Sequence, residues 1–168
     1  MIEILPMQPH QVEAAKDVIT TVASHIYEPG KPVEDFQEML RHRRLLEDVD
    51  NFQEVYFNHN GVFLAVLEAG KLIGTGALKQ IDAETAELKR LWLLEQYHGQ
   101  KIGYAVVIRL FAFAREKGYQ RVRLQTGEEQ VRALAFYKRL GFYQIPSYNG
   151  DNDEVSLEIR LESVQNLS

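Results

Sequence analysis

The segment from Glu87 to Gly118 constrains the fold more than any other part of the chain. It contains a strand, a short loop with Gly99 and Gly103, and a long apolar helix in direct succession, and Gly118 is suited to the C-terminal cap of that helix. A helix N-terminus leaves its first N–H groups unpaired and carries about half a positive charge. Because glycine lets an anion approach the backbone closely, this segment is suited to bind a phosphate or a pyrophosphate.

Two other phosphate-binding patterns are absent from this loop. Its glycines do not follow the order G-x-G-x-x-G of dinucleotide-binding proteins, and no Gly-Lys-Ser or Gly-Lys-Thr of a P-loop is present. The pattern G-x-S-x-G, which marks a serine nucleophile, is also missing from the sequence. These observations argue against a dinucleotide-dependent enzyme and against a nucleoside-triphosphate hydrolase.

Hydrophobic periodicity predicts strands and helices along the whole chain, in the order β-α-α-β-β-β-α-β-α-β-β. This order predicts an α/β (α+β) fold: a mixed, mostly antiparallel twisted sheet with a βαβ crossover, flanked by helices. No linker or internal repeat interrupts it, so residues 1–168 are expected to form a single domain. The expected strands span 2–5, 62–68, 71–80, 83–94, 121–125, 142–145 and 155–161. The expected helices span 9–25, 33–47, 104–117 and 130–140, and residues 49–61 are ambiguous.

Composition excludes several classes of function. The 168 residues include no cysteine, which excludes disulfides, cysteine-bearing zinc sites and a cysteine nucleophile. Lys and Arg number 19 and Asp and Glu number 24, and the resulting formal charge of −5 argues against nucleic-acid binding. The five histidines lack metal-ligand spacing, so no metal is expected. The sequence shows no signal-peptide pattern and no apolar run of about 20 residues. We therefore expect a cytoplasmic protein without membrane contact.

Two runs of sequence resemble a known family. ELKRLWLLEQYHGQKIGYAVV resembles motif A of the GNAT family of N-acetyltransferases, and EQVRALAFYKRLGF resembles its motif B. The motifs stand in the family's order and at its spacing, and the resemblance extends from about Gly61 to Leu161. It implies an acyl-CoA N-acyltransferase type of fold and an acetyl-CoA-dependent N-acetyltransferase. The implied reaction is direct transfer, in a ternary complex, to an amine of a small molecule or an amino-acid-like substrate, since no cysteine can carry the acetyl group.

The resemblance also implies which residues hold acetyl-CoA, the acetyl donor. In this family the pantetheine arm lies where two parallel strands separate, and it pairs with strand backbone much as an added strand does. Leu93 and Leu94 stand at that position, and the amide of one of them is a candidate to polarise the thioester carbonyl. The implied pyrophosphate contacts are Gln100, Lys101, Ile102, Gly103 and Tyr104, and the far side is lined by Gln130, Ala133 and Phe136.

Four positions depart from the family pattern. His98 stands where the family usually has arginine, Lys101 where it has its middle glycine, Glu95 where it often has proline, and Gln130 where motif B opens with asparagine. The departures at His98, Lys101 and Gln130 motivate an alternative function, a CoA-binding sensor or regulatory module without transferase activity. A third interpretation, a general nucleotide-binding protein, predicts binding of ATP or NAD in place of CoA.

The candidate catalytic residues are Glu87 and Tyr137. The resemblance places a carboxylate base at Glu87 in some members; the alternatives are a solvent-facing strand residue and a base that acts through water. Tyr137 matches the motif B tyrosine that donates a proton to the CoA sulfur in many members, and its alternative is packing of the helix. Tyr27, Phe36 and Trp92 are candidates for contacts with the acceptor, with core packing as the alternative for Trp92. The expected partners are the amine substrate and, as one option, a second copy of the chain in a homodimer.

Overall fold

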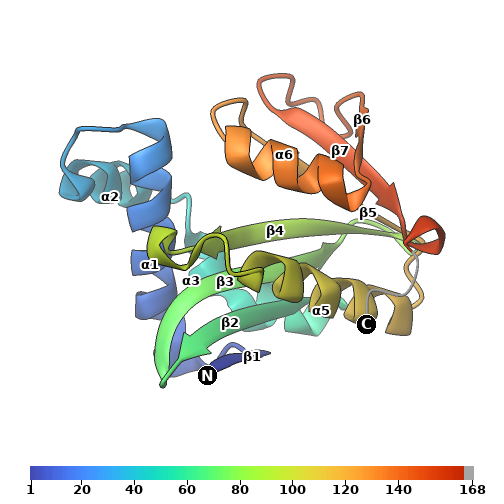
Figure 1. Cartoon of the computed structure of the whole chain (residues 1–168), viewed down its shortest axis with the longest axis horizontal. Helices are drawn as coiled ribbons and strands as arrows, with labels where there is room; N and C mark the ends of the chain where they lie inside the picture. Colours follow the sequence, from blue (N-terminus) through green and yellow to red (C-terminus); the bar gives the residue numbers. More distant parts are fainter. Residues whose placement is uncertain (165–168) are drawn as a thin grey trace.

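The computed structural model describes residues 1–164, and one seven-stranded sheet organises them (Figure 1). The strands are β1 (Ile2–Pro6), β2 (Val62–Glu68), β3 (Lys71–Gln80), β4 (Thr85–Leu93), β5 (Arg121–Thr126), β6 (Tyr143–Ile145) and β7 (Val155–Arg160). They lie in the order β1-β2-β3-β4-β5-β7-β6. β4 and β5 run parallel, and all the other neighbouring strand pairs are antiparallel. This arrangement confirms the predicted mixed, mostly antiparallel sheet.

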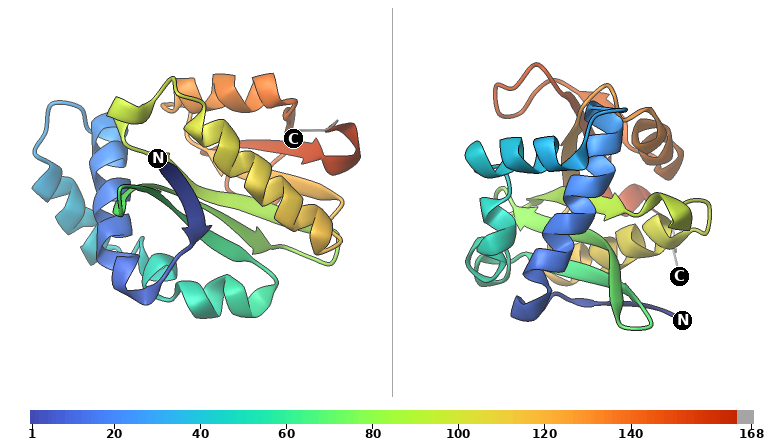
Figure 2. Two further views of the ribbon diagram at one scale, coloured as in Figure 1. Left: turned by 60° about the horizontal axis from the view of Figure 1, so that its bottom comes forward. Right: turned by 90° about the vertical axis from the view of Figure 1, so that its left-hand side faces the viewer.

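Helices cover both faces of this sheet (Figure 2). The helices are α1 (Val12–Tyr27), α2 (Val33–His42), α3 (Glu47–Asp50), α4 (Phe52–Val55), α5 (Ile102–Glu116) and α6 (Val131–Leu140), with the 3-10 helices η1 (Pro9–Gln11), η2 (Phe57–His59), η3 (Glu95–Tyr97) and η4 (Leu161–Ser163). α5 connects the parallel strands β4 and β5, as the βαβ crossover predicts. Within residues 1–164, no helix has both the length and the apolar character needed to cross a lipid bilayer.

The helix predicted over residues 33–47 is shorter in the structure. α2 ends at His42, and Arg44 adopts a left-handed backbone with a φ of 55°. An L-residue disfavours that conformation and a right-handed helix cannot continue through it, so the chain turns and begins again as α3 and α4. The ambiguous residues 49–61 therefore form short helical turns rather than one regular element.

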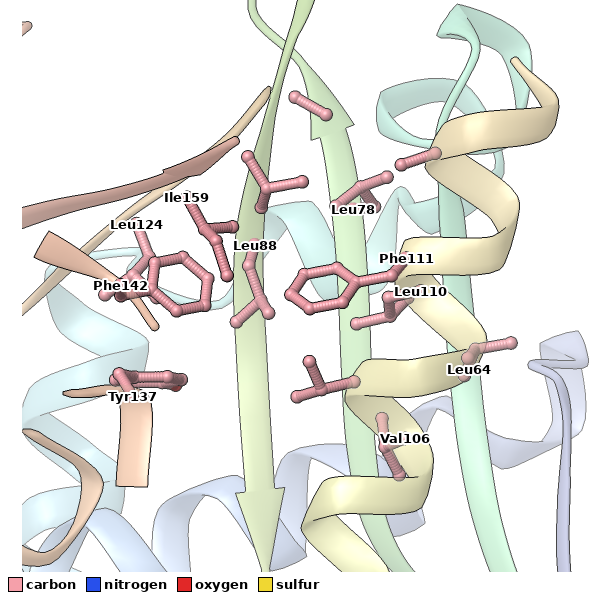
Figure 3. Close-up of a cluster of buried hydrophobic side chains, with 14 of the residues drawn as sticks. Leu64, Leu78, Leu88, Val106, Leu110, Phe111, Leu124, Tyr137, Phe142 and Ile159 are labelled. Carbon is pink, nitrogen blue, oxygen red and sulfur yellow. The ribbon is translucent and has the colours of Figure 1, made fainter. Parts of the chain in front are cut away.

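Strand β2 separates two hydrophobic cores. Leu64 and Val66 belong to the first core, which α5 and α6 cover, whereas Phe63 and Ala65 belong to the second core, which α1 to α4 cover. Successive side chains of a strand point to opposite faces, so a strand that is buried on both faces is apolar throughout. Figure 3 shows part of the first core, where Phe111 of α5 lies over the sheet.

The parallel strands β4 and β5 stay paired over a short distance. Their register joins Thr85–Glu87 to Arg121–Arg123, and beyond these residues the strands diverge (Figure 1). Within the part of the chain that the structure describes, the β5-facing edge of β4 has no strand partner from Leu88 to Leu93. An open strand edge presents N–H and C=O groups that an extended ligand can pair with.

A β-bulge interrupts β4 beside this gap. Gly76 of β3 lies opposite two residues of β4, Arg90 and Leu91, and Arg90 has a φ of 56°. The extra residue changes which side chains face the first core. Leu88 faces it before the bulge, and the odd-numbered Leu91 and Leu93 face it afterwards. The bulge therefore decides how the last three residues of β4 are presented to the gap.

The space beside Gly76 gives a test of this packing. A Cβ atom at position 76 would lie 2.5 Å from Cγ1 of Val106 and 3.4 Å from Cδ1 of Leu91. We expect Gly76→Ala to lower the free energy of unfolding by about 1–3 kcal/mol, because α5 must shift to admit the methyl group. Urea denaturation measures this change. Gly103→Ala is the control, since a Cβ at 103 meets no described atom within 4 Å; equal stability of the two variants would contradict the packing.

Candidate active site

A cavity of about 1100 Å³ lies where β4 and β5 separate. Its walls come from the C-terminal half of α1, the end of β4, the loop after β4, the first turn of α5, and α6. The structure thus brings residues of both sequence motifs to one cavity. The predicted site residues in its lining are Trp92, Leu93, Lys101, Ile102, Gly103, Tyr104, Gln130, Ala133 and Phe136, and those outside the lining are Tyr27, Phe36, Glu87, Leu94, Gln100 and Tyr137.

The first turn of α5 is suited to hold an anion. Gly99 and Lys101 have φ values of 82° and 63° and turn the loop into the helix. The N–H of Ala105 donates to the C=O of Lys101 at 3.1 Å, so the N–H groups of residues 102–104 precede the helical ladder and point out of the helix end. A Cβ at Gly103 would meet no described atom within 4 Å, which leaves this end open. The geometry and the partial positive charge fit a pyrophosphate.

The structure accounts for the departure at Lys101. This residue is the N-cap of α5 and has a left-handed backbone, which a glycine adopts without a steric penalty. The backbone of Lys101 takes the same conformation at a cost of about 1–2 kcal/mol. Because the anion site is formed by main-chain N–H groups, replacing glycine by lysine leaves those groups in place.

The end of β4 presents one of the two predicted leucines to the gap. The N–H of Leu94 donates to the C=O of Ile73 on β3 at 3.0 Å. Neighbouring residues of an extended strand direct their backbone groups to opposite edges, so the N–H and C=O of Leu93 point into the gap. Nε2 of His98 lies 3.0 Å from the C=O of Leu93. The N–H of Leu94 is already bonded within the sheet, so Leu93 is the leucine whose backbone groups face the gap.

The last turn of α1 contacts both sides of the gap. Nδ1 of His25 lies 2.5 Å from Oε1 of Glu95, in the loop after β4. The side-chain amide of Gln130, at the N-cap of α6, donates to the hydroxyl of Tyr27 at 2.8 Å. His25 and Glu95 both line the cavity. Sequence reasoning missed this pair because its members are 70 positions apart and no local pattern marks them.

The other two candidate acceptor contacts differ in environment. Phe36 is 6% exposed and belongs to the second core, because the apolar face of α2 turns towards α1. The structure thus places Phe36 in core packing and outside the cavity lining. Trp92 packs against the same core and also lines the cavity, so its position is compatible with core packing and with contact to an acceptor.

Glu87 lies on the face of β4 opposite the first core. Its Oε2 accepts a hydrogen bond from the hydroxyl of Tyr148 at 2.6 Å, and Nζ of Lys89 lies 3.9 Å from its Oε1. The guanidinium of Arg123 lies over the Tyr148 ring, 5.5 Å from the ring centre. Burial, followed by contact with the Glu87 carboxylate, raises the pKa of Tyr148, so this hydroxyl remains a donor at neutral pH. Sequence reasoning missed Tyr148, which stands 61 positions away in a polar loop.

Tyr137 lies in the first core, next to the cavity wall. It is 6% exposed, and Figure 3 shows it in the same cluster as Phe142. Its ring centre lies 5.6 Å from that of Phe142 and 5.5 Å from that of Phe136. Burial raises the pKa of the Tyr137 phenol, so the group is protonated throughout the neutral range. Phe136, one residue earlier, lines the cavity.

Gly103 gives a direct test of the anion site. We expect Gly103→Val to weaken the binding of CoA by more than about tenfold, because the side chain would fill the space through which a phosphate reaches the helix end. Isothermal titration calorimetry measures the affinity. Ala112→Val is the control, since it places the same side chain at an exposed position of α5. An unchanged CoA affinity in Gly103→Val would contradict the anion site.

Comparison with known sequences agrees with this geometry. A model described as "Acetyltransferase (GNAT) family" matches residues 24–142. "Probable N-acetyltransferase family 8 member 5" of Mus musculus is 30% identical over 125 residues, covering 71% of this chain and 53% of that protein. "Uncharacterized N-acetyltransferase YjgM" of Escherichia coli is 25% identical over 117 residues, covering 68% of this chain and 70% of that protein. The chain spans about half the length of the first curated relatives it matches.

Solved structures share the whole fold. An acetyltransferase of the GNAT family from Staphylococcus aureus has a TM-score of 0.82 at 20% identity and covers 96% of this chain and 99% of its own. The PaiA N-acetyltransferase of Thermoplasma acidophilum, solved in complex with coenzyme A, has a TM-score of 0.79 at 24% identity and covers 95% of this chain and 99% of its own. These likenesses confirm the predicted fold class. Because the family model matches more than half of the 168 residues, the chain belongs to the acetyltransferase (GNAT) family.

Proposed function

We propose that this chain transfers the acetyl group of acetyl-CoA to an amine of a small molecule or an amino-acid-like substrate, by direct transfer in a ternary complex. The observation that carries the proposal is the meeting of an open β4 edge, the anion-binding end of α5 and one wall of α6 around a single cavity. An extended pantetheine arm suits the strand edge and a pyrophosphate suits the helix end. Family membership supports the same activity.

The cofactor side of the site uses main-chain groups. When bound, acetyl-CoA supplies the acetyl group as a reactive thioester. The N–H groups of residues 102–104 would bind its pyrophosphate, and the ammonium group of Lys101 would add a charge-assisted contact. The N–H of Leu93, directed into the gap, is the remaining candidate of the two leucine amides to polarise the thioester carbonyl. Ala133 and Phe136 of α6 line the opposite wall.

The acceptor amine must lose a proton before it attacks. An amine with a reference pKa of about 10.4 is almost fully protonated at pH 7, and its neutral form costs about 4.6 kcal/mol there. Glu87 is the proposed base, and the hydrogen bond from Tyr148 orients its carboxylate. Because Glu87 lies outside the cavity lining, a water molecule is the proposed relay between the amine and the carboxylate.

Tyr137 is the proposed donor to the leaving sulfur. The reference pKa of a phenol, about 10, lies above that of a thiol, about 8.5, so the proton transfer is slightly uphill before any effect of the protein. Burial raises the pKa of Tyr137 further. The phenol thus holds its proton tightly, which favours a hydrogen bond to the sulfur over complete proton transfer.

The activity is tested by the release of CoA thiol from acetyl-CoA in the presence of a panel of small amines and amino acids. Amine-dependent thiol release supports the acetyltransferase. CoA binding by calorimetry, with no thiol release across the panel, instead supports a CoA-binding sensor or regulatory module, the function that the departures at His98, Lys101 and Gln130 motivate. Binding of ATP or NAD in place of CoA would indicate a general nucleotide-binding protein.

Removing the proposed base has a characteristic pH signature. We expect Glu87→Gln to lower kcat by about a hundredfold at neutral pH and to displace the pH–rate profile to alkaline values, because the amine must then lose its proton to solvent. Steady-state rates over a range of pH measure both effects. Glu84→Gln is the control, since that carboxylate is paired with Arg121 at 3.4 Å and lies outside the cavity. An unshifted profile in Glu87→Gln would assign the base to another group.

Removing the proposed acid separates rate from binding. We expect Tyr137→Phe to lower kcat by about ten- to a hundredfold with unchanged CoA affinity, because the ring stays in the core and the hydrogen bond to the leaving sulfur is lost. Tyr119→Phe is the matched control. That tyrosine is 5% exposed, and its hydroxyl donates to the C=O of Asn60 at 2.8 Å, outside the cavity lining. Wild-type turnover in Tyr137→Phe would leave core packing as the role of this residue.

A further inference from the structure

Arg90 occupies a position that glycine usually fills. It is the first residue of the β4 bulge and has a φ of 56°. This is the left-handed conformation that the first residue of a G1-type bulge adopts. A residue with a Cβ atom disfavours this conformation, because Cβ approaches the following carbonyl oxygen. The conformation costs about 1–2 kcal/mol, which other interactions of the folded chain must offset.

The side chain of Arg90 makes that interaction with a different part of the chain. Its Nε and Nη2 lie 3.0 and 2.6 Å from the two carboxylate oxygens of Asp48, and Nη2 also donates to the C=O of Leu45 at 2.7 Å. The hydroxyl of Tyr56 donates to the same carboxylate at 2.6 Å. On the main chain, the hydroxyl of Thr75 donates to the C=O of Arg90 at 2.6 Å. The bulge is thus held from both its side chain and its backbone.

The partner of Arg90 lies beside residues that are buried in the second core. Asp48 lies on α3, and the adjacent Val49 and the more distant Tyr56 are fully buried in the second core. The side chains of Arg90 and Asp48 are 19% and 20% exposed, so water screens the pair weakly. A sheltered, bidentate pair of this kind is stronger and more directional than an exposed surface pair.

The position of the bulge matters for the cavity. A shift of one residue along a strand turns every following side chain to the opposite face. Leu91, Trp92 and Leu93 follow the bulge and all line the cavity. If the bulge were lost, these three residues would turn over. The side chains and backbone groups that now face away from the gap would then face it.

We propose that Arg90 is a positioning residue, whose ion pair with Asp48 holds the left-handed bulge of β4 and so fixes the backbone of residues 91–93 along the cofactor gap. The proposal rests on the proposed function where it names CoA as the ligand of that gap. It assigns a role in the site to α3, which lies outside both sequence motifs and contributes no residue to the cavity lining.

The test compares two double variants that both lack the ion pair, Arg90→Ala with Asp48→Asn and Arg90→Gly with Asp48→Asn. They differ by one methyl group, and only alanine resists the left-handed backbone. We expect the affinity for CoA, measured by calorimetry, to fall about tenfold in the alanine variant and to stay within about twofold of wild type in the glycine variant, because the fraction of molecules with a formed bulge scales the apparent affinity.

A second measurement reports on the strand itself. The N–H of Leu94 is bonded to the C=O of Ile73, directly after the bulged segment. We expect its hydrogen exchange to accelerate about tenfold in the alanine double variant and to stay at the wild-type rate in the glycine double variant. Asp50→Asn is the control for both measurements, because it removes a carboxylate of the same helix that is paired with Lys16 at 2.9 Å.

The outcomes separate this proposal from the proposed function. Equal CoA affinity and equal exchange at Leu94 in the two double variants would overturn it. A loss of thermal stability with unchanged affinity and exchange would also overturn it, since the ion pair would then be structural only. A wild-type chain that binds CoA without acetylating amines refutes the proposed function but leaves both measurements decisive. If wild type does not bind CoA, the exchange rate of Leu94 alone decides.

Discussion

The early separation of β4 from β5 is the constraint on which the rest of the structure depends. The strands pair over Thr85–Glu87 and Arg121–Arg123 and then diverge, so one edge of β4 enters a cavity instead of a sheet. Backbone groups inside a protein need hydrogen-bond partners, so this edge must be solvated or bound by a ligand. The α5 helix end, the wall of α6 and the last turn of α1 are arranged around that requirement.

Packing on both faces keeps the two sides of the gap apart. The first core joins β4 and α5 to β5 and β7 through residues such as Leu88, Leu124 and Ile159. The second core fixes α1 to α4 on the opposite face. At the end of α1, His25 contacts Glu95 and Tyr27 contacts Gln130. Glu95 and Gln130 are two of the positions that depart from the family pattern, so these departures form contacts between α1 and the site. The cavity is thus bounded by elements that lie far apart in the sequence, from α1 to α6.

Much of the fold followed from local pattern. The order of strands and helices, the glycine loop and the apolar α5 depend on residues close together in sequence, and they were predicted correctly apart from the early end of α2. The apolar positions of β4 change from even-numbered at Leu88 to odd-numbered at Leu91, and this change is visible in the sequence. The pattern alone does not distinguish a bulge from an irregular strand end. Phe36 faces a core, and the amide of Leu94 is bonded within the sheet. Neither orientation could be predicted, because the type of a residue does not specify the direction in which it points.

The sequence by itself determined the fold class, the family and the helix end that can hold a pyrophosphate, since each depends on short-range periodicity or on a contiguous motif. Tertiary structure alone decided which groups act together. Glu87 meets Tyr148 across 61 positions, His25 meets Glu95 across 70, and Asp48 meets Arg90 across 42. These pairs depend on how the sheet twists and where its strands part. Both properties arise from packing summed over the whole chain, so no local stretch of sequence encodes them.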